Sequence, residues 1–353
     1  MMRRECDTIR NRPRRIVPLT ICFRALALAG LCVTALNVQS AGAAPPASSA
    51  WSPPRSADGR PDLQGVWTNS SITTLERTDP SLPLKLSHQQ AQRLEDSRAR
   101  LEAAANAPTN PQEGAPDAGA SVGGYNAFWL DRGSRVGVVR GEARSSWIVE
   151  PENGRMPVSE GGAARIQSIL QRRGEDGPEG MNPADRCLVG SRGSGGPPML
   201  NNIYNNTYQI IQTADHVVIL VEMMHDARII RLNQNHKAPE LKQWLGDSIG
   251  RWEGDTLIVE TRNWKEDHAS YEPVVLSDTA LVTERFTRTG PSEILYEFAV
   301  DDPQVYSKPW RGEMTFTPAG GPVFEYACHE GNYALHGILS GARVLEGRLK
   351  VRE

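Results

Sequence analysis

Apolar and polar residues alternate along the second half of the chain. From Asn205 onward, β-branched and aromatic residues recur at every second position in short runs, which Gly, Asp and Asn interrupt. Such alternation is typical of strands with one buried face. The predicted strands cover residues 207–213, 216–223, 228–232, 250–253, 256–262, 280–287, 294–300, 313–317 and 323–328. About nine short strands at regular spacing predict a mainly β fold, either an antiparallel barrel or a barrel-like sandwich.

Two helices are predicted before this strand-rich half. Residues 87–105 form a nearly continuous run of helix-forming residues. Ser87 and Gln90 fit a capping box, in which each side chain binds the backbone amide of the other residue. A second, shorter helix is predicted over residues 160–173.

These elements fit one β-rich domain over residues 61–353. A first strand is predicted over residues 62–71, and a helical and loop insertion follows it over residues 85–180. The main strands then occupy residues 205–330. The chain contains 32 glycines and 25 prolines, which indicates many turns and suits a β body with long loops.

The start of the chain has the parts of an export signal. An Arg-rich segment precedes an apolar run over residues 25–38, and Ala-Gly-Ala follows at residues 41–43, so residues 1–43 are predicted to be a cleaved signal peptide. The apolar run is shorter than the roughly twenty residues of a stable membrane span, so none is expected after cleavage; an uncleaved anchor is the alternative. Residues 44–60, rich in Pro, Ser and Ala, predict a flexible tether. The predicted location is therefore outside the cytoplasm, either periplasmic or secreted.

Two cysteines, Cys187 and Cys328, remain after the signal peptide. An even number of cysteines in an exported chain predicts a disulfide. In the chain-entropy model, a crosslink that closes a loop of this length stabilises a protein by about 4–5 kcal/mol. The alternatives are two buried free thiols, or a catalytic Cys328 beside His329, although neighbouring residues of a strand point to opposite faces.

Charge and motif content exclude several functional classes. The net charge of the whole chain is −3, and removal of the Arg-rich leader makes the mature chain more acidic. The sequence has no basic stripe interleaved with aromatic residues, so nucleic acid is not an expected partner. It also lacks H-x-H and H-E-x-x-H spacings, a P-loop and a nucleotide or flavin fingerprint, so neither a metal nor a cofactor is predicted. The alternative is a metal site built from His225, His329 and a carboxylate, which the fold would have to bring together. The expected partner is a small-molecule ligand or substrate, and the oligomeric state is left open.

A polar group formed by Glu222, His225, Asp226 and Arg228 follows the apolar run HVVILV. Strand alternation places Glu222 on one face of its strand, whereas His225 and Asp226 fall in a connection, where functional groups concentrate. A histidine near a carboxylate can act as a general base, and Arg228 can bind a substrate anion or oxyanion. The alternative is a turn whose polar groups satisfy one another and the backbone.

A second polar group, His329, Glu330, Asn332 and Tyr333, follows Cys328. In the functional interpretation, His329 or Glu330 stands at the mouth of a pocket, and Asn332 and Tyr333 supply hydrogen bonds. The alternative is a strand end that the disulfide anchors, followed by a turn. We expect the first group, Glu222, His225, Asp226 and Arg228, to share one concave pocket with His329 or Glu330.

Trp252 is one of several tryptophans in the strand-rich half, together with Trp244, Trp264 and Trp310. Such side chains either fill the core and the barrel ends or form a stacking wall for a flat or sugar-like ligand. In the second case Trp252 is a binding residue.

Several longer runs of the sequence form a recognisable set: PDLQGVWTNSS, RCLVGS, GDSIGRWEGDTLIVETRN, DDPQVYSKPW and EYACHEGNY. Through these runs, the chain resembles a large family of exported bacterial proteins of uncharacterised activity. The runs are distributed over nearly all of the mature chain. The resemblance implies an exported, single-domain protein and implies no particular reaction.

A second resemblance concerns the first strand. Gly65-Val66-Trp67 is similar to the G-x-W of lipocalin-like barrels. It implies that Trp67 closes one barrel end and that a late arginine, taken here as Arg343, packs on the indole. The long insertion after Trp67 departs from the lipocalin pattern.

Two functional classes follow from these observations, and a scaffold without a ligand is a third option. The first is an exported β-barrel protein that binds a small, partly hydrophobic molecule in a polar-lined pocket. The second is an exported hydrolase, lyase or isomerase that uses Glu222, His225 and Asp226 as its acid–base group.

Overall fold

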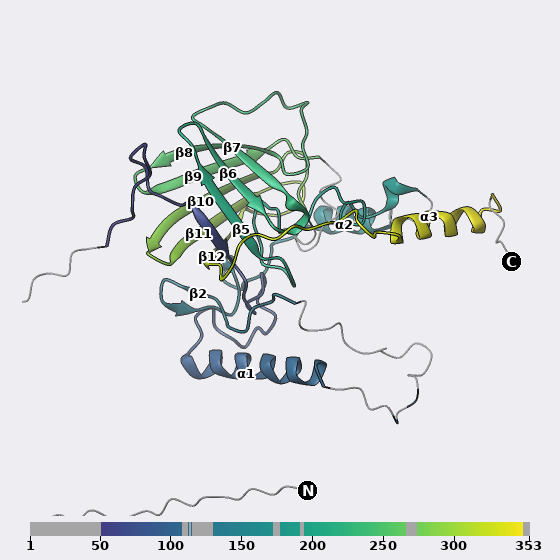
Figure 1. The fold of residues 1–353 in the computed structure, drawn as a ribbon, viewed down its shortest axis with the longest axis horizontal. Coiled ribbons are helices and arrows are strands. Elements are labelled where there is room, and N and C mark those ends of the chain that lie inside the picture. The colour runs from purple at the N-terminus through teal and green to yellow at the C-terminus, as the bar shows by residue number, and fades with distance from the viewer. Residues whose placement is uncertain are drawn as a thin grey trace, which may run out of the picture. The chain divides into compact units, whose positions relative to one another are not determined.

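A curved mixed sheet closes on itself to form a barrel (Figure 1). Nine of the described strands form the ring in the order β1-β5-β6-β7-β8-β9-β10-β11-β12, and antiparallel pairing of β12 with β1 closes it. The barrel strands are β1 (Gly65–Thr68), β5 (Thr207–Gln212), β6 (His216–Val221), β7 (Ala227–Leu232), β8 (Asp247–Glu253), β9 (Thr256–Arg262), β10 (Leu281–Gly290), β11 (Glu293–Asp301) and β12 (Trp310–Pro318). The prediction of a mainly β barrel is therefore confirmed.

The computed structural model describes residues 51–107, 112, 114, 130–171, 177–190, 194–265 and 274–348. The predicted signal peptide and the first part of the predicted tether lie outside these residues. Residues 51–60, the remainder of that tether, contain a turn in which the Ser56 amide donates to the Arg60 carbonyl, and Arg55 bridges to Pro61. Within the described residues, no helix combines the length and the apolar character that a membrane crossing requires.

Side-chain alternation along the strands places the core inside the barrel. In β5 and β6, Tyr208, Ile210, Val217 and Ile219 are buried, and the residues between them face outward. Aromatic rings fill the interior: the Tyr296 ring centroid lies 4.9 Å from that of Phe286 and 5.4 Å from that of Phe316. A ligand therefore cannot occupy the centre of the barrel without displacing these rings.

One neighbouring pair, β7 and β8, is parallel, so the ring is mixed and not purely antiparallel as predicted. The chain leaves β7 at Leu232 and returns along the barrel through residues 233–246 before it enters β8. That long connection, in place of a tight hairpin, sets β8 parallel to β7. The two strands pair at Arg231–Ile249 and Leu232–Gly250.

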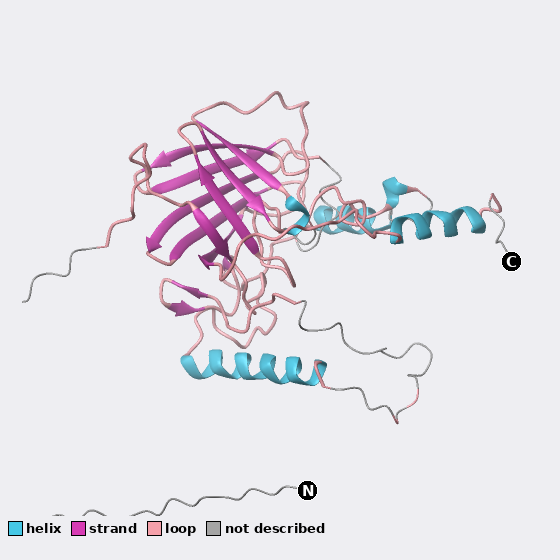
Figure 2. Cartoon of the chain, viewed as in Figure 1, coloured by secondary structure: helices cyan, strands magenta, loops and turns pink. Residues whose placement is uncertain are grey.

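Residues 323–328 do not form the predicted ninth strand (Figure 2). β12 already pairs with β11 on one side and with β1 and β4 (Ile148–Glu150) on the other. A closed ring offers no free edge for a further strand. The segment instead runs extended, and the Phe324 amide donates to the Glu222 carboxylate at 3.1 Å.

The insertion after β1 holds the two predicted helices, α1 (His88–Ala105) and α2 (Glu160–Gln171). The capping box is present: the Gln90 amide donates to Ser87 Oγ at 3.2 Å, and the Ser87 amide donates to Gln90 Oε1 at 2.8 Å. The insertion also contains β4 and the short hairpin of β2 (Val138–Val139) and β3 (Glu142–Ala143).

A third helix, α3 (Ala334–Leu345), was not predicted. Leu335, Ile338, Leu339 and Ala342 repeat at the helical spacing of three and four residues, so the signal was present in the sequence. Gly337 and Gly341, which lower helix propensity, obscured it.

The predicted disulfide between Cys187 and Cys328 is confirmed, with the two Cα atoms 5.8 Å apart. It joins the loop before β5 to the segment after β12. All strands from β5 to β12 therefore lie inside the covalent loop.

Trp67 is buried, as the G-x-W pattern predicts, and its Nε1 donates to the Leu63 carbonyl at 3.0 Å. Gly65 has φ +134°, and a Cβ at this position would lie 3.3 Å from Trp67 Nε1, which explains the glycine of the pattern. The stacking arginine is Arg288 of β10, 5.4 Å above the ring, and not Arg343. Arg343 lies in α3 and pairs with Glu346.

Candidate functional site

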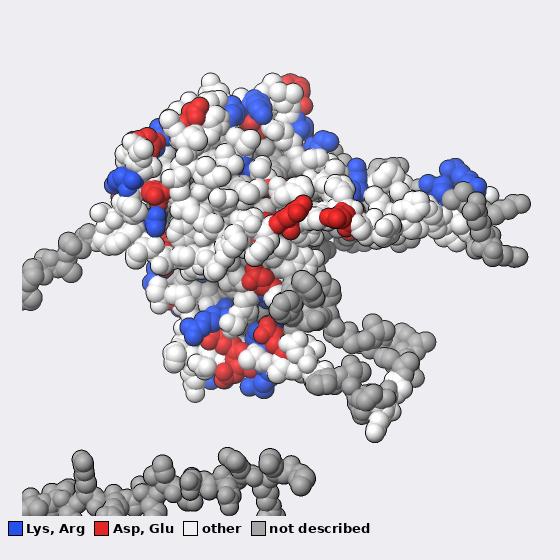
Figure 3. Space-filling view, in the orientation of Figure 1, with Lys and Arg blue, Asp and Glu red and all other residues white. Residues whose placement is uncertain are grey.

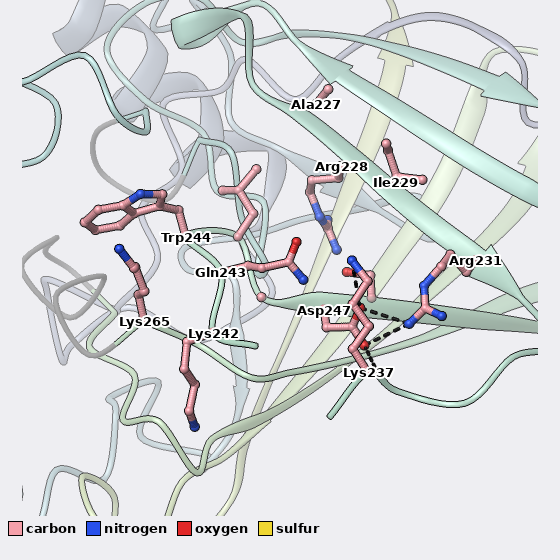
Figure 4. A pocket seen from close by; sticks show the side chains of 13 residues that line it. Ala227, Arg228, Ile229, Arg231, Lys237, Lys242, Gln243, Trp244, Asp247 and Lys265 are labelled. Atoms are coloured by element: carbon pink, nitrogen blue, oxygen red, sulfur yellow. Dashed lines mark hydrogen bonds and ion pairs between the residues drawn. The ribbon is translucent and has the colours of Figure 1, made fainter. Parts of the chain in front are cut away.

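A pocket of about 490 Å³ opens where β7 and β8 separate (Figure 4). Pairing between the two strands begins at Arg231 and Ile249. A gap therefore forms between Ala227 at the start of β7 and Asp247 at the start of β8. The connection over residues 233–246 and Lys265, just after β9, form the other walls. We call this hollow the β7–β8 pocket.

Arg228 lines the pocket although its side chain points toward the barrel interior. Its guanidinium is 1% exposed and pairs through two nitrogens with Glu284 of β10, with Nη1 2.9 Å from Oε1. The third guanidinium nitrogen, Arg228 Nε, is buried and has no hydrogen-bond partner. An unpaired buried donor is costly, and because Arg228 Nε has almost no exposed surface, a ligand gains this hydrogen bond only when the pocket wall opens around it.

Tyr296 completes the anchor beneath Arg228. Its hydroxyl donates to Glu284 at 2.8 Å and accepts a hydrogen bond from the Met199 amide at 2.9 Å. Burial and the adjacent Glu284 raise the pKa of Tyr296 well above 10, so the phenol remains protonated. The ion pair therefore sits in a fixed hydrogen-bonded frame inside the barrel.

Asp247 forms one end of the pocket and is fully engaged. Its carboxylate accepts hydrogen bonds from Arg231 Nη2 and from the Lys237 amide, each at 2.9 Å, and lies 3.0 Å from His236 Nδ1. Burial opposes ionisation of Asp247, but these hydrogen bonds outweigh it and hold its pKa below 3.8. The single carboxylate that lines the pocket is thus satisfied by protein groups.

The other end of the pocket is formed by Trp244 and Lys265, whose ammonium lies 4.7 Å from the indole centroid. Among the described residues, no carboxylate pairs with Lys265. Lys242 pairs with the exposed Asp278, at 3.5 Å. Gln243, between the two ends, extends its side-chain amide toward Arg228 (Figure 4).

The balance of charge at this site is positive. Five cationic side chains line the pocket against one carboxylate, and among the described residues two further carboxylates, Glu284 and Asp278, pair with members of this set. The five cations are Arg228, Arg231, Lys237, Lys242 and Lys265. A hollow with excess positive charge and an unpaired donor suits an anion.

The structure does not bring the four residues of the first polar group to one hollow. Glu222 is buried and accepts hydrogen bonds from Asn205 Nδ2 at 2.9 Å and from the Phe324 amide, so it holds the segment after β12. His225 is exposed, in a left-handed backbone conformation, and lines a different hollow beside Phe324. Only Arg228 reaches the β7–β8 pocket.

Asp226 faces the glycine-containing loop before β5. Its Oδ2 accepts a hydrogen bond from the Gly190 amide at 2.7 Å, and a Cβ on Gly195 would lie 2.9 Å from the same oxygen. Burial raises the pKa of Asp226 from 3.8 to about 6, although the Gly190 amide favours the charged form. Asp226 therefore titrates in the range of near-neutral pH.

We expect this titration to affect stability. Because the pKa of Asp226 is higher in the folded state than in the unfolded state, folding is favoured at low pH, and stability falls as the pH rises from about 4 to about 6. The shift corresponds to at most about 3 kcal/mol. Asp226→Asn should therefore raise the free energy of unfolding by about 1–3 kcal/mol at pH 7.5 and change it little at pH 4, as measured by urea unfolding.

Asp301→Asn, which changes an exposed carboxylate at the end of β11, is the matched control and should leave the pH profile unchanged. An Asp226→Asn variant whose stability follows the same pH profile as the unmodified protein would contradict the expectation.

The second predicted group lies apart from the β7–β8 pocket. Among its members, Asn332 Nδ2 lies 3.7 Å from Cys187 Sγ, and the Tyr333 side chain is 81% exposed. His329 and Glu330 are also exposed, in the turn after the disulfide. Trp252 is half-buried against the core, and its Nε1 is buried without a hydrogen-bond partner.

Sequence reasoning missed most of the β7–β8 pocket. Lys237, Lys242, Gln243 and Trp244 belong to the connection between two strands, and Lys265 follows a third. A long polar connection between short strands was the available signal, because such loops commonly carry function. The sequence pointed to two pocket residues: Arg228 as a binder of anions, and Trp244 as one of several tryptophans that could stack on a ligand.

Comparison of the chain with protein-family models, with curated proteins and with solved structures gives no match. In the part of the chain that the structure describes, no group of three or more His, Cys, Asp and Glu side chains is arranged to hold a metal ion. The geometry of the β7–β8 pocket is therefore the basis for assigning a function.

Proposed function

We propose that this is an exported β-barrel protein that binds a small organic anion in the β7–β8 pocket. The observation that carries the proposal is Arg228, a buried guanidinium that lines the pocket with Nε unpaired. Its charge is compensated by Glu284, so it acts as a fixed hydrogen-bond donor. Lys265 adds a positive charge that no carboxylate of the described residues pairs with, and Lys237 and Lys242 pair only at 4.0 Å with Asp247 and at 3.5 Å with Asp278.

The pocket also suits an apolar portion of the ligand. Ile229, Trp244 and Leu245 contribute apolar surface to its walls. Small-molecule sites are commonly lined by such side chains, with a few polar groups that orient the ligand. Its volume falls within the range of small-molecule sites, so a compact organic acid fits the site in size and in charge.

Export is supported by the leader and by the disulfide. Residues 1–43 have the pattern of a signal peptide, and the bridge between Cys187 and Cys328 suits an oxidising compartment. Binding is favoured over acid–base catalysis because Glu222 and Asp226 each accept a hydrogen bond from a backbone amide, and they do not converge on one hollow with His225.

Calorimetric titration of the disulfide-bonded mature protein tests the proposal. We expect hexanoate to bind and hexan-1-ol, which lacks the charge, to bind at least tenfold more weakly, at low ionic strength. Lys265→Gln should weaken hexanoate binding about three- to tenfold, because it removes the ammonium that has no carboxylate partner among the described residues.

Lys308→Gln, which neutralises an exposed lysine outside the pocket, is the matched control and should bind hexanoate as the unmodified protein does. Added salt should weaken the binding, because screening reduces the attraction of exposed charges. Equal affinities for hexanoate and hexan-1-ol would refute the proposal.

A further inference from the structure

Three apolar side chains form a row on the outside of the barrel. Ile211 of β5 pairs with Val218 of β6, and Val218 pairs with Ile229 of β7, so the three lie side by side across the strands. All three face outward, and Ile211 and Ile229 are 40% and 58% exposed. Two strand spacings give this apolar row a length of about 10 Å.

The row begins at the β7–β8 pocket. Ile229 belongs both to the row and to the wall of the pocket. Figure 3 shows mostly uncharged side chains over β5, β6 and β7, with charged ones gathered around the margin of this surface. An apolar track thus leads from a cationic hollow across the face of three strands.

The neighbouring outward row is less exposed at two of its three positions. Gln209, Leu220 and Ala227 form this row across the same strands. Gln209 and Leu220 are half-buried and line a hollow together with Val323 and Phe324 of the segment after β12, whereas Ala227 is exposed. On β5 and β7, Ile211 and Ile229 are therefore the open apolar positions beside a half-buried Val218.

We propose that the ligand is an amphiphilic anion whose acidic group occupies the β7–β8 pocket and whose apolar chain lies along Ile229, Val218 and Ile211. This inference rests on the proposed function, because it assigns the acidic group to the same pocket. The cationic side chains of the pocket bind the acidic group of the ligand. The apolar row removes part of the ligand's apolar chain from water. The occupant is a free amphiphile, taken up as a single molecule.

The proposal predicts that binding affinity rises with the length of the ligand's apolar chain. A fully buried methylene tightens binding about fourfold. A chain on an open face buries only part of its surface, so dodecanoate should bind at least about tenfold more tightly than hexanoate, with both acids below their micelle-forming concentrations.

Ile211→Ser tests the row at the end that is distant from the pocket. It should weaken dodecanoate binding about three- to tenfold and leave hexanoate binding unchanged, because the shorter chain does not reach β5. Leu101→Ser removes an equally apolar, 63% exposed side chain from α1 and should change neither affinity.

The outcomes separate the two proposals. If hexanoate binds in preference to hexan-1-ol but dodecanoate binds no more tightly, the amphiphile inference fails and the anion pocket stands. If neither acid binds better than its alcohol, the proposed function itself fails. If the protein sediments with phosphatidylglycerol vesicles but does not bind monomeric dodecanoate, the row contacts a membrane surface and the inference is overturned.

Discussion

We expect the Cys187→Ser/Cys328→Ser double variant to lose about 4–5 kcal/mol of unfolding free energy. The bridge spans 141 positions of sequence, and a crosslink over so long a loop removes much conformational entropy from the unfolded chain. Because the loop contains β5 to β12, barrel unfolding is constrained by the bridge. Guanidinium unfolding followed by circular dichroism, with and without reductant, measures the loss.

Each single serine variant is the matched control, and it should be as unstable as the double variant if the bridge alone is responsible. A loss below about 1 kcal/mol would show that other contacts hold the two segments together. Labelling of the denatured, unreduced mature protein should find no free thiols, and two free thiols would refute the bridge.

Arg228→Met should cost about 3–5 kcal/mol of stability. The substitution leaves Glu284, which is fully buried, without its cationic partner inside the barrel. By contrast, Arg251 pairs with Glu260 at 2.7 Å on the surface, where its side chain is 49% exposed. Arg251→Met should therefore cost less than about 1 kcal/mol. Urea unfolding of both variants and of the unmodified protein measures the two losses.

A double substitution distinguishes the cost of leaving a buried charge unpaired from the cost of losing the packing of the Arg228 side chain. Arg228→Met/Glu284→Leu removes both charges and should recover a large part of the stability that Arg228→Met loses. If the double variant is less stable than Arg228→Met, Arg228 stabilises the barrel mainly through the packing of its side chain and not through the ion pair. In either case the double variant lacks the buried donor of the proposed site.

Much of the barrel could be predicted because its strands bury only one face. The alternation of HVVILV, in which Val217, Ile219 and Val221 point inward, is visible without any knowledge of the strand's neighbours. The capping box of Ser87 and Gln90 is similarly local and was found. The pairing of Cys187 with Cys328 needed only a count, because just two cysteines remained.

Features that depend on long-range arrangement were harder to predict. Residues 323–328 have the composition of a strand, but the ring leaves them no edge. Arg288 and Arg343 are both late arginines, and only the fold shows that β10 brings Arg288 over Trp67.

The same limit applies to the candidate site. The pocket is assembled from β7, β8, their connection and Lys265, so no single stretch of sequence contains it. The two groups that were contiguous in sequence, around Glu222 and around Glu330, do not share any of the hollows that Asn332, His225 and Glu222 line.

The parallel strand pair that frames the pocket follows from strand parity. Around a closed ring, neighbouring strands can alternate in direction throughout only if the number of strands is even. Nine of the described strands form this ring, so at least one neighbouring pair must be parallel, and that pair is β7 and β8. A barrel with one strand more or fewer could close with hairpins alone, and it would then have no topological need for the returning connection that frames Arg228.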